Sequence, residues 1–353
     1  MGKYWSDFVK QLTPYEPGEQ PCMDGVLKLN TNENPFGPSQ KVLSAIKAQL
    51  GNQLRLYPPP SADLLKQAIA NYYGLKGTQI FLGNGSDEIL AHVFNGLLKK
   101  GLPILFPDIT YSFYPVFCQL FDIDFKEIPL KDDLSIDLAD YEVPNGGIVF
   151  PNPNAPTGRL LRIGEIEHLL KANQNSVVVI DEAYIDFGGQ SSVGLLADNP
   201  NLLVTQTMSK SRSMAGMRIG FALGSANLIE GLDRVKNSFN SYPLGHLQIA
   251  AGISAIEDSS HFKDTCQRVI YNRGKLTNDL EELGFSVLPS AGNFVLVRHC
   301  EKSAPKIYGQ LKDSGILVRY FNKPRLDNFL RITVGTIEQN EQLIAALSNI
   351  LDS

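Results

Sequence analysis

Short apolar segments alternate with amphipathic segments between residues 79 and 223. Most of the apolar segments end at Gly, Pro or Asp, which is typical of strands that stop at a turn. The predicted strands are residues 79–82, 103–106, 147–150, 177–180, 202–205 and 219–223. Because these strands lack polar alternation, we expect both of their faces to be covered, which predicts a mostly parallel sheet sandwiched by helices.

The pattern changes after residue 245. A long helical stretch over 247–283 comes first, and strand patterns and a closing helix follow it. These later segments are strands at 286–288, 294–298, 317–320 and 329–334 and a helix at 338–351. We therefore expect an α/β fold with a large domain, residues 36–245, and a smaller α+β domain, residues 246–353. Residues 1–35 would pack across both domains as an arm.

Composition narrows the kind of partner. The 353 residues carry a net charge of −5 without a basic stripe, which disfavours nucleic acid and anionic membrane surfaces. No apolar run is long enough to cross a bilayer, and the N-terminus lacks a signal-peptide pattern. The cysteines, Cys22, Cys118, Cys266 and Cys300, lack the spacing of a metal site. We expect small molecules and a second copy of the chain as partners, and a cytoplasmic setting.

Polar residues collect where the predicted strands end, and ligands of open α/β sheets bind outside the carboxyl ends of the strands. Residues 83–88 read Gly-Asn-Gly-Ser-Asp-Glu and lead into a helical pattern. Gly85, Ser86 and Asp87 would therefore offer free backbone N–H groups and a positive helix dipole to a phosphate. The alternative is that Ser86 or Asp87 is only a helix N-cap.

Three further strand ends carry candidate functional side chains. Tyr111 follows the second strand, where its ring could stack on a flat ligand, although a core tyrosine would give the same pattern. Asp181 directly follows a buried strand and needs a cation or hydrogen bonds to stay charged. Lys210 follows another strand among small hydroxyl residues, and lysine amines bond to aldehydes once their pKa is lowered. A solvated lysine is the alternative, but compatible groups at successive strand ends favour one site.

Longer motifs surround these residues. They are residues 14–20 (PYEPGEQ), 29–39 (LNTNENPFGPS), 181–187 (DEAYIDF), 209–220 (SKSRSMAGMRIG) and 330–336 (LRITVGT). Over essentially its whole length the sequence resembles the class I/II pyridoxal-phosphate aminotransferases of fold type I, and among them the histidinol-phosphate aminotransferase subfamily. The resemblance implies that fold, pyridoxal 5′-phosphate as the cofactor, and a homodimer.

The resemblance also implies roles for single residues at the cofactor. Lys210 would carry it covalently and shuttle a proton as general base and acid. Asp181 would keep the pyridine nitrogen protonated, Tyr184 would bind the phenolic oxygen of the cofactor, and Tyr111 would stack on its ring. The phosphate would be held by Gly85, Ser86, Asp87, Thr207, Ser209 and Arg218, and by Tyr57 of the neighbouring subunit.

For the substrate, the resemblance implies that Arg331 and Arg319 bind anionic groups, since a guanidinium pairs with a carboxylate or phosphate through two hydrogen bonds. Tyr15, Asn32 and Glu33 would line the pocket from the arm. Structural salt bridges are the alternative for both arginines.

The sequence departs from the family at one position. The family usually reads Asn-Pro-Thr-Gly, and its Asn binds the same phenolic oxygen as the tyrosine. Here residues 152–158 read Asn-Pro-Asn-Ala-Pro-Thr-Gly, so Ala155 stands where that amide is expected. We predict that Asn154 supplies the bond through a small shift of the loop.

The expected reaction is amino transfer from L-histidinol phosphate to 2-oxoglutarate, which yields imidazole acetol phosphate and glutamate in histidine biosynthesis. Two alternatives keep the cofactor: a threonine-phosphate decarboxylase and an aromatic amino-acid aminotransferase. The glycine turn at 83–85 also prompts a nucleotide-binding protein or dehydrogenase, but the GxGxxG spacing is incomplete and Lys210 and Asp181 would have no role. A protein of this fold that binds ligands without turnover is the remaining alternative.

Overall fold

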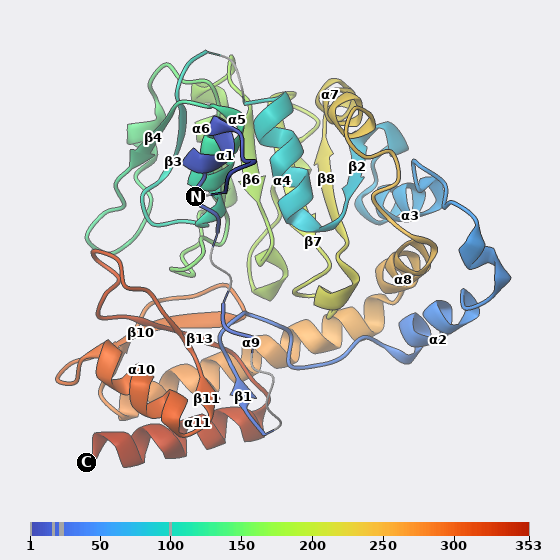
Figure 1. Cartoon of the computed structure of the whole chain (residues 1–353). Coiled ribbons are helices and arrows are strands. Elements are labelled where there is room, and N and C mark those ends of the chain that lie inside the picture. The colour runs from blue at the N-terminus through green and yellow to red at the C-terminus, as the bar shows by residue number, and fades with distance from the viewer. Residues whose placement is uncertain (1, 16–17, 21–24, 99–100, 353) are drawn as a thin grey trace.

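The strands predicted between residues 79 and 223 form one sheet in the upper part of Figure 1. The computed structural model describes residues 2–15, 18–20, 25–98 and 101–352. Within these residues the sheet has seven strands in the order β2 (Ile80–Gly83), β8 (Gly220–Gly224), β7 (Leu202–Thr207), β6 (Val178–Asp181), β5 (Ile148–Pro151), β3 (Ile104–Pro107) and β4 (Phe125–Ile128). Strand β8 runs antiparallel to both of its neighbours, and the other pairs are parallel. The predicted α/β fold with a mostly parallel sheet is confirmed.

The strand β4 was not predicted. It lies at the edge of the sheet, and its sequence Phe-Lys-Glu-Ile leaves the first three side chains exposed. Charged side chains are typical of edge strands, where they discourage pairing with other chains. Because Lys126 and Glu127 interrupt its apolar residues, the sequence pattern does not indicate this strand.

Helices cover both faces of the large sheet. One face packs against α4 (Gly85–Gly96), α5 (Phe113–Phe121) and α7 (Ala226–Asn237). The other face is covered by α3 (Asp63–Tyr73), α6 (Ile163–Ala172) and α8 (His246–Glu257), and α2 (Gln40–Ala48) packs on α8. Successive strand residues alternate between the two cores, as the pleat of a strand requires. This packing leaves the strand ends, where the polar residues lie, as the part of the sheet open to a ligand.

A second, antiparallel sheet lies below the first in Figure 1. Its order is β12 (Arg319–Tyr320), β13 (Leu330–Thr333), β10 (Phe294–His299) and β9 (Phe285–Val287), while β1 (Leu27–Lys28) pairs in parallel with β11 (Ile316–Leu317). Around these strands lie α9 (Ser259–Glu282), α10 (Ala304–Asp313) and α11 (Ile337–Leu351). Short 3₁₀ helices occur at Asn52–Arg55, Gly77–Gln79, Leu138–Tyr141, Ile185–Phe187, Ser192–Leu195 and Ala215–Met217.

The helix predicted over 247–283 is two helices, and the break lies at Asp258. Asp and Ser side chains compete with the backbone for hydrogen bonds, so the run Asp-Ser-Ser ends one helix and starts the next. The apolar side chains of α8 pack in the core of the large sheet, whereas those of α9 pack with the small sheet. We therefore propose Asp258, in place of residue 245, as the boundary between the two domains.

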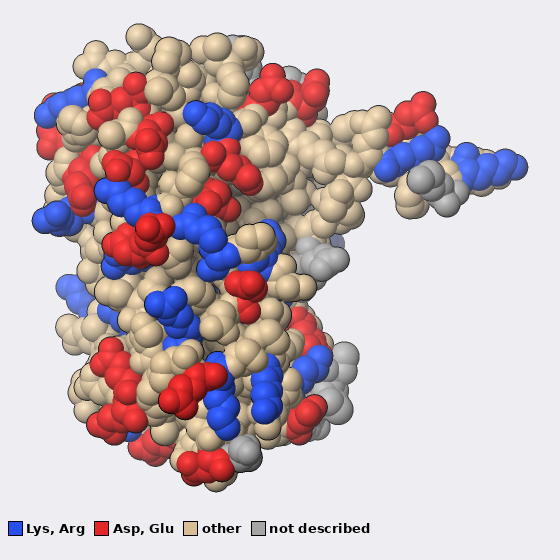
Figure 2. All heavy atoms as spheres, turned by 90° about the vertical axis from the view of Figure 1, so that its left-hand side faces the viewer, with Lys and Arg blue, Asp and Glu red and all other residues tan. Residues whose placement is uncertain are grey.

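The arm contacts both domains. The short helix α1 (Asp7–Gln11) has no buried residue, and the chain after it is joined to the large domain where Thr13 N donates to Gln119 Oε1 over 3.0 Å. Further on, Leu27 and Leu29 are buried in the core of the small domain. Figure 2 shows acidic and basic side chains interspersed on one face of the molecule. None of the helices in the described ranges has the length and apolar character needed to span a bilayer.

Candidate active site

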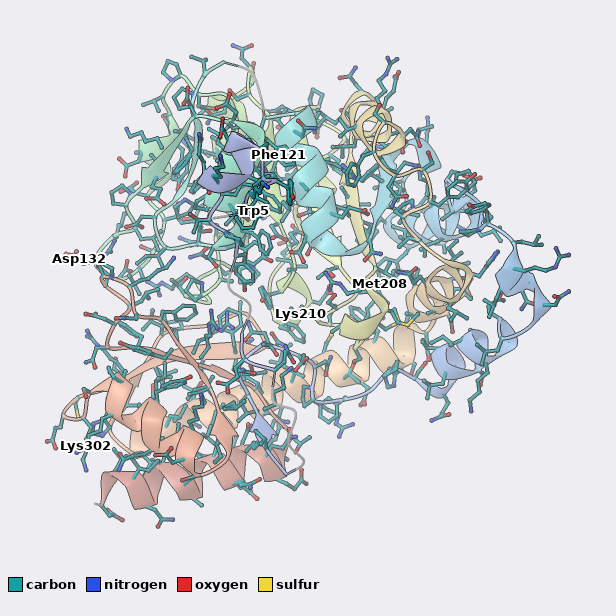
Figure 3. All side chains as sticks on the ribbon, in the orientation of Figure 1. Trp5, Phe121, Asp132, Met208, Lys210 and Lys302 are labelled. Atoms are coloured by element: carbon teal, nitrogen blue, oxygen red, sulfur yellow. The ribbon has the colours of Figure 1, made fainter. Side chains whose placement is uncertain are left out.

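A cavity of about 260 Å³ opens between the carboxyl ends of the large sheet and the small sheet. Figure 3 shows Lys210 in this position, between the two bodies of the molecule. The predicted site residues that line it are Tyr15, Asn32, Glu33, Ser86, Asp87, Tyr111, Asp181, Tyr184, Thr207, Ser209, Lys210, Arg218, Arg319 and Arg331. Residues from the arm, both sheets and the loop after β7 are thus brought to one place.

One wall of the cavity is suited to an anion. Helix α4 begins at Gly85, so the free N–H groups of its first turn face the same region as Arg218. The guanidinium of Arg218 donates to Asp87 Oδ2 over 3.0 Å and to Ser209 Oγ over 3.3 Å. The backbone at position 85 has a φ of +80°, which favours glycine, and a Cβ there would displace this guanidinium. A helix N-terminus, a guanidinium and hydroxyl groups together form a site of the kind that binds phosphate.

Asp181 supplies a buried carboxyl group at the end of β6. Burial raises the pKa of this carboxyl group to about 7, even though the backbone N–H of Ala183 donates to Oδ1 over 3.2 Å. The negative charges of Asp87 and Glu182 raise the pKa further. A carboxylate in this environment is stabilised by a positively charged N–H group placed in the cavity.

Lys210 lies in the turn that follows β7, and the arm holds it. Its Nζ donates to Thr31 O over 2.9 Å, and its own carbonyl accepts from Asn34 Nδ2 over 3.0 Å. The amine is 5.7 Å from the centre of the Tyr184 ring, whose Oη accepts from Asn32 Nδ2 over 3.1 Å. Residues 31–34 therefore contact both the lysine and the tyrosine that the sequence identified.

Two arginines face each other on the small sheet. The antiparallel register of β12 and β13 places Arg319 directly opposite Arg331. Both guanidinium groups lie 5.5 Å from the centre of the Phe321 ring, and Arg331 Nη2 donates to Asn30 O over 2.9 Å. Burial lowers the pKa of Arg331, and the charge of Arg319 lowers it further. Like charges directly opposite each other on paired strands are destabilising, so this pair is suited to an anionic ligand.

The alternative of structural salt bridges for these arginines has no support within the described ranges, where neither has a carboxylate within 4.0 Å. Instead, the ion pairs near the cavity join other groups. Lys28 Nζ contacts Glu33 Oε2 at 2.6 Å, and Arg218 contacts Asp87.

An aromatic wall closes another side of the cavity. The ring of Tyr15 stacks on Phe113 with 4.3 Å between ring centres, and Tyr111 lies next to both. Tyr111 Oη donates to Asp87 Oδ1 over 2.6 Å. Burial, and then the charge of Asp87, raise the pKa of Tyr111 well above its ordinary value, so this phenol is neutral and acts as a donor. A flat ring of a ligand could stack on these aromatic side chains.

Three predicted residues do not line the cavity: Gly85, whose backbone lies beside Arg218, Asn154 and Tyr57. Asn154 Nδ2 donates to Ile109 O and to Thr157 Oγ1, each over 3.0 Å, so the loop shift that the sequence predicted is not present. Tyr57 is 81% exposed and stacks on Tyr242, far from the cavity of its own chain. Cys22 and residues 16–17 of the first motif lie outside the described residues.

Sequence reasoning missed Thr31 and Phe321. Thr31 contributes a backbone carbonyl to Lys210, and a carbonyl leaves no signal in the residue type. Phe321 packs beside both arginines, and only its place two residues after Arg319 could have indicated it. In the described parts of the chain, no three His, Cys, Asp or Glu side chains are close enough to hold a metal ion.

Fold and cavity together define a class of protein: an α/β enzyme with an anion site, a buried acid and a lysine around one cavity at the end of its sheet. Comparison with known proteins agrees with this class. The model of the family described as aminotransferase class I and II matches residues 24–347. The chain belongs to this family.

Named relatives are similar over almost the entire chain. The chain is 59% identical over 351 residues to a histidinol-phosphate aminotransferase of Hydrogenovibrio crunogenus, covering 99% of each chain. It is 56% identical over 350 residues to one of Pseudomonas fluorescens, covering 99% of this chain and 100% of that one. The crystal structure of histidinol-phosphate aminotransferase from Sinorhizobium meliloti in complex with pyridoxal-5′-phosphate superimposes with a TM-score of 0.90 at 25% identity, covering 100% of this chain and 98% of that one.

The residues around the cavity fit pyridoxal 5′-phosphate. The buried carboxyl group of Asp181 suits a protonated ring nitrogen, because burial disfavours its charge unless a cation is near. The space beside Gly85 and Arg218 suits a phosphate, and the amine of Lys210 suits an aldehyde. The ring nitrogen, the phosphate and the aldehyde of this cofactor therefore each have a complementary group in the chain.

Proposed function

We propose that this enzyme transfers the amino group of L-histidinol phosphate to 2-oxoglutarate, yielding imidazole acetol phosphate and glutamate in histidine biosynthesis. The likeness to histidinol-phosphate aminotransferases at 59% and 56% identity supports this substrate pair. The observation that carries the proposal is the arginine pair at the substrate side of the cavity, which has no acidic partner in the described residues.

When bound, the cofactor supplies an aldehyde that takes up the amino group and a ring that delocalises negative charge. Lys210 holds this group and then moves a proton from and to the substrate carbon that bears nitrogen. Asp181 keeps a proton on the ring nitrogen, since its buried carboxylate gains a cationic partner there. Tyr184 would donate to the ring oxygen, and Tyr111 would hold the ring by stacking. The contacts of Ser86, Asp87, Thr207, Ser209 and Arg218 orient the phosphate.

The arginine pair recognises both substrates in turn. Arg319 and Arg331 bind the phosphate ester of histidinol phosphate in the first half of the reaction and a carboxylate of 2-oxoglutarate in the second. Tyr15 packs beside the imidazole from the arm, and Glu33 lies at the same wall. A single anion site thus serves two substrates of different shape.

The enzyme works as a homodimer in the cytoplasm, and Tyr57 reaches the cofactor phosphate of the neighbouring subunit. The support for the dimer is a set of exposed apolar side chains in the connection between α2 and α3 and at the start of α3, a segment on the right-hand side of Figure 1. It consists of Leu50, Leu54, Leu56, Tyr57 and Leu64, which are each about half exposed or more. Apolar patches of this kind mark contact surfaces.

A visible absorbance spectrum of the purified protein loaded with pyridoxal 5′-phosphate tests cofactor, reaction and substrate together. Histidinol phosphate should shift the cofactor band, and 2-oxoglutarate should restore it. No shift with histidinol phosphate, combined with turnover of another amine, would refute the proposal.

Two alternative enzymes of the same fold can be distinguished from this proposal by their product or by their relative rates. A threonine-phosphate decarboxylase releases carbon dioxide without any oxo-acid acceptor. An aromatic aminotransferase turns over phenylalanine at least as fast as histidinol phosphate in side-by-side assays.

A further inference from the structure

The cavity wall beside Tyr184 has no polar side chain from the loop at residues 152–158. Ala155 and Pro156 are the loop residues that line this wall together with Tyr184, and neither side chain can form a hydrogen bond. Asn154 is buried behind them, where its amide nitrogen is used by Ile109 O and Thr157 Oγ1. The amide nearest to the tyrosine must therefore come from elsewhere in the chain.

Asn32 of the arm provides it. This residue is 1% exposed, lines the cavity, and donates from Nδ2 to Tyr184 Oη over 3.1 Å. Its backbone is fixed on both sides, because Asn32 N donates to Thr333 Oγ1 over 2.9 Å and Asn32 O accepts from Asn293 Nδ2 over 2.9 Å. Its φ of 55° lies in the left-handed region, which Asn tolerates better than most residues.

The hydrogen-bond network decides which end of the amide faces the tyrosine. The Thr333 hydroxyl accepts from Asn32 N and donates to Asn32 Oδ1 over 3.2 Å, so the NH₂ group points to Tyr184. Because Tyr184 Oη accepts this bond, its own hydrogen remains available to a ligand in the cavity. With the amide reversed, Tyr184 would donate to Asn32 Oδ1 and lose that hydrogen.

We propose that Asn32 is a positioning residue that acts through Tyr184. Its amide fixes the phenol oxygen and directs the phenol hydrogen into the cavity, and it strengthens that donor by polarising it. Asn32 thereby replaces the amide that is missing at Ala155. This role differs from the substrate contact expected from the sequence, and it rests on the proposed cofactor site.

The test compares two substitutions of Asn32, each made alone and together with Tyr184→Phe. Asn32→Gly removes the amide without straining the left-handed backbone. Asn32→Asp keeps the size and the acceptor for Thr333, but its carboxylate takes the phenol hydrogen away from the cavity. Titration of each apoprotein with pyridoxal 5′-phosphate, followed by absorbance, gives the affinity, and melting temperatures of the apoproteins show that the variants fold.

We expect Asn32→Gly to weaken cofactor binding about fivefold, the value of one hydrogen bond, and Asn32→Asp to weaken it more. In the Tyr184→Phe background, Asn32→Gly should cause no further loss, because its effect passes through the phenol oxygen.

A role limited to anchoring the arm on Thr333 would give the opposite results. Asn32→Asp would then be milder than Asn32→Gly, and the losses would add in the Tyr184→Phe background. A larger loss in Asn154→Ala than in Asn32→Gly would likewise overturn the inference. If Asn32→Gly binds like the native chain while Tyr184→Phe and Lys210→Ala bind weakly, only this inference fails. If Tyr184→Phe and Lys210→Ala also bind like the native chain, the proposed cofactor site fails as well.

Discussion

The two ends of the cavity differ in how their charges are compensated. At the cofactor end, formed by Asp87, Asp181, Lys210 and Arg218, the chain supplies much of the compensation itself: Arg218 pairs with Asp87 at 3.0 Å, and Lys210 donates to a carbonyl of the arm. At the substrate end, Arg319 and Arg331 face each other across paired strands and have no acidic partner in the described part of the chain. The cofactor end is thus largely preorganised, whereas an anion would complete the substrate end in the function that we propose.

This difference has a kinetic consequence. A permanently bound group takes part in every turnover, so changes at the cofactor end should appear mainly in kcat. The substrate anion comes and goes, so changes at the arginine pair should appear mainly in KM. The following predictions test this division, beginning with the largest effect.

Lys210→Ala should lower kcat by about 10⁴-fold or more, because no other amine replaces the proton transfer at the substrate carbon. Steady-state amino transfer from histidinol phosphate measures the loss. Lys210→Arg is the control, since it keeps the positive charge but cannot bond to an aldehyde, and it should be equally inactive. An active Lys210→Arg variant would mean that only the charge at this position matters.

Asp181→Asn should lower kcat about 10³-fold, because the ring nitrogen loses a buried electrostatic partner. The same substitution should stabilise the apoprotein at high pH. Burial raises the pKa of Asp181 to about 7 from its ordinary value of 3.8, so the folded apoprotein keeps a proton that the unfolded chain releases. Stability of the apoprotein therefore falls as pH rises through this range, and melting temperatures at pH 5 and pH 8 measure the fall.

Glu182→Gln is the matched control for Asp181→Asn. Burial also raises the pKa of Glu182 to about 7, but this carboxyl group accepts from Ser192 N over 2.6 Å and does not line the cavity. The Glu182→Gln substitution should reduce the pH dependence of apoprotein stability while leaving kcat little changed. Equal losses of kcat in both variants would show that the effect is one of packing.

Arg331→Ala should lower kcat/KM for histidinol phosphate about 10²-fold, since a half-buried charge pair with the substrate anion is lost. Most of the change should appear in KM, and cofactor affinity should stay the same. Arg298→Ala is the control on the neighbouring strand β10, where the side chain is exposed. If Arg331→Ala lowered only kcat, the proposed kinetic difference between the cofactor end and the substrate end would be wrong.

Tyr57→Phe should weaken cofactor binding about fivefold, the value of one hydrogen bond across the dimer, without changing KM. The smallest effect is expected here, because the phosphate keeps its contacts within the chain. Absorbance titration measures the affinity, and sedimentation confirms that the variant is still a dimer. Unchanged affinity would place Tyr57 outside the neighbouring site.

The sequence specified the cofactor end better than the substrate end. Asp181 is the last residue of β6 and Lys210 lies in the turn after β7, and the apolar pattern predicted both strands within one or two residues. Strand and candidate residue are therefore read from the same stretch of sequence. The break at Asp258 and the edge strand β4 were missed, because a helix restart and a half-polar strand both interrupt the pattern that signals them.

The sequence alone indicates the apolar strands of the large sheet, the turns after them and the polar residues at each turn, since all three are contiguous in the chain. Only the tertiary structure decided that Arg319 lies opposite Arg331 and that Asn32, in place of Asn154, contacts Tyr184. These contacts depend on the register of a sheet and on an arm bound to Thr333, 301 residues further along the chain. Such contacts between residues far apart in the sequence depend on how the whole fold packs. The local alternation of apolar and polar residues does not predict them.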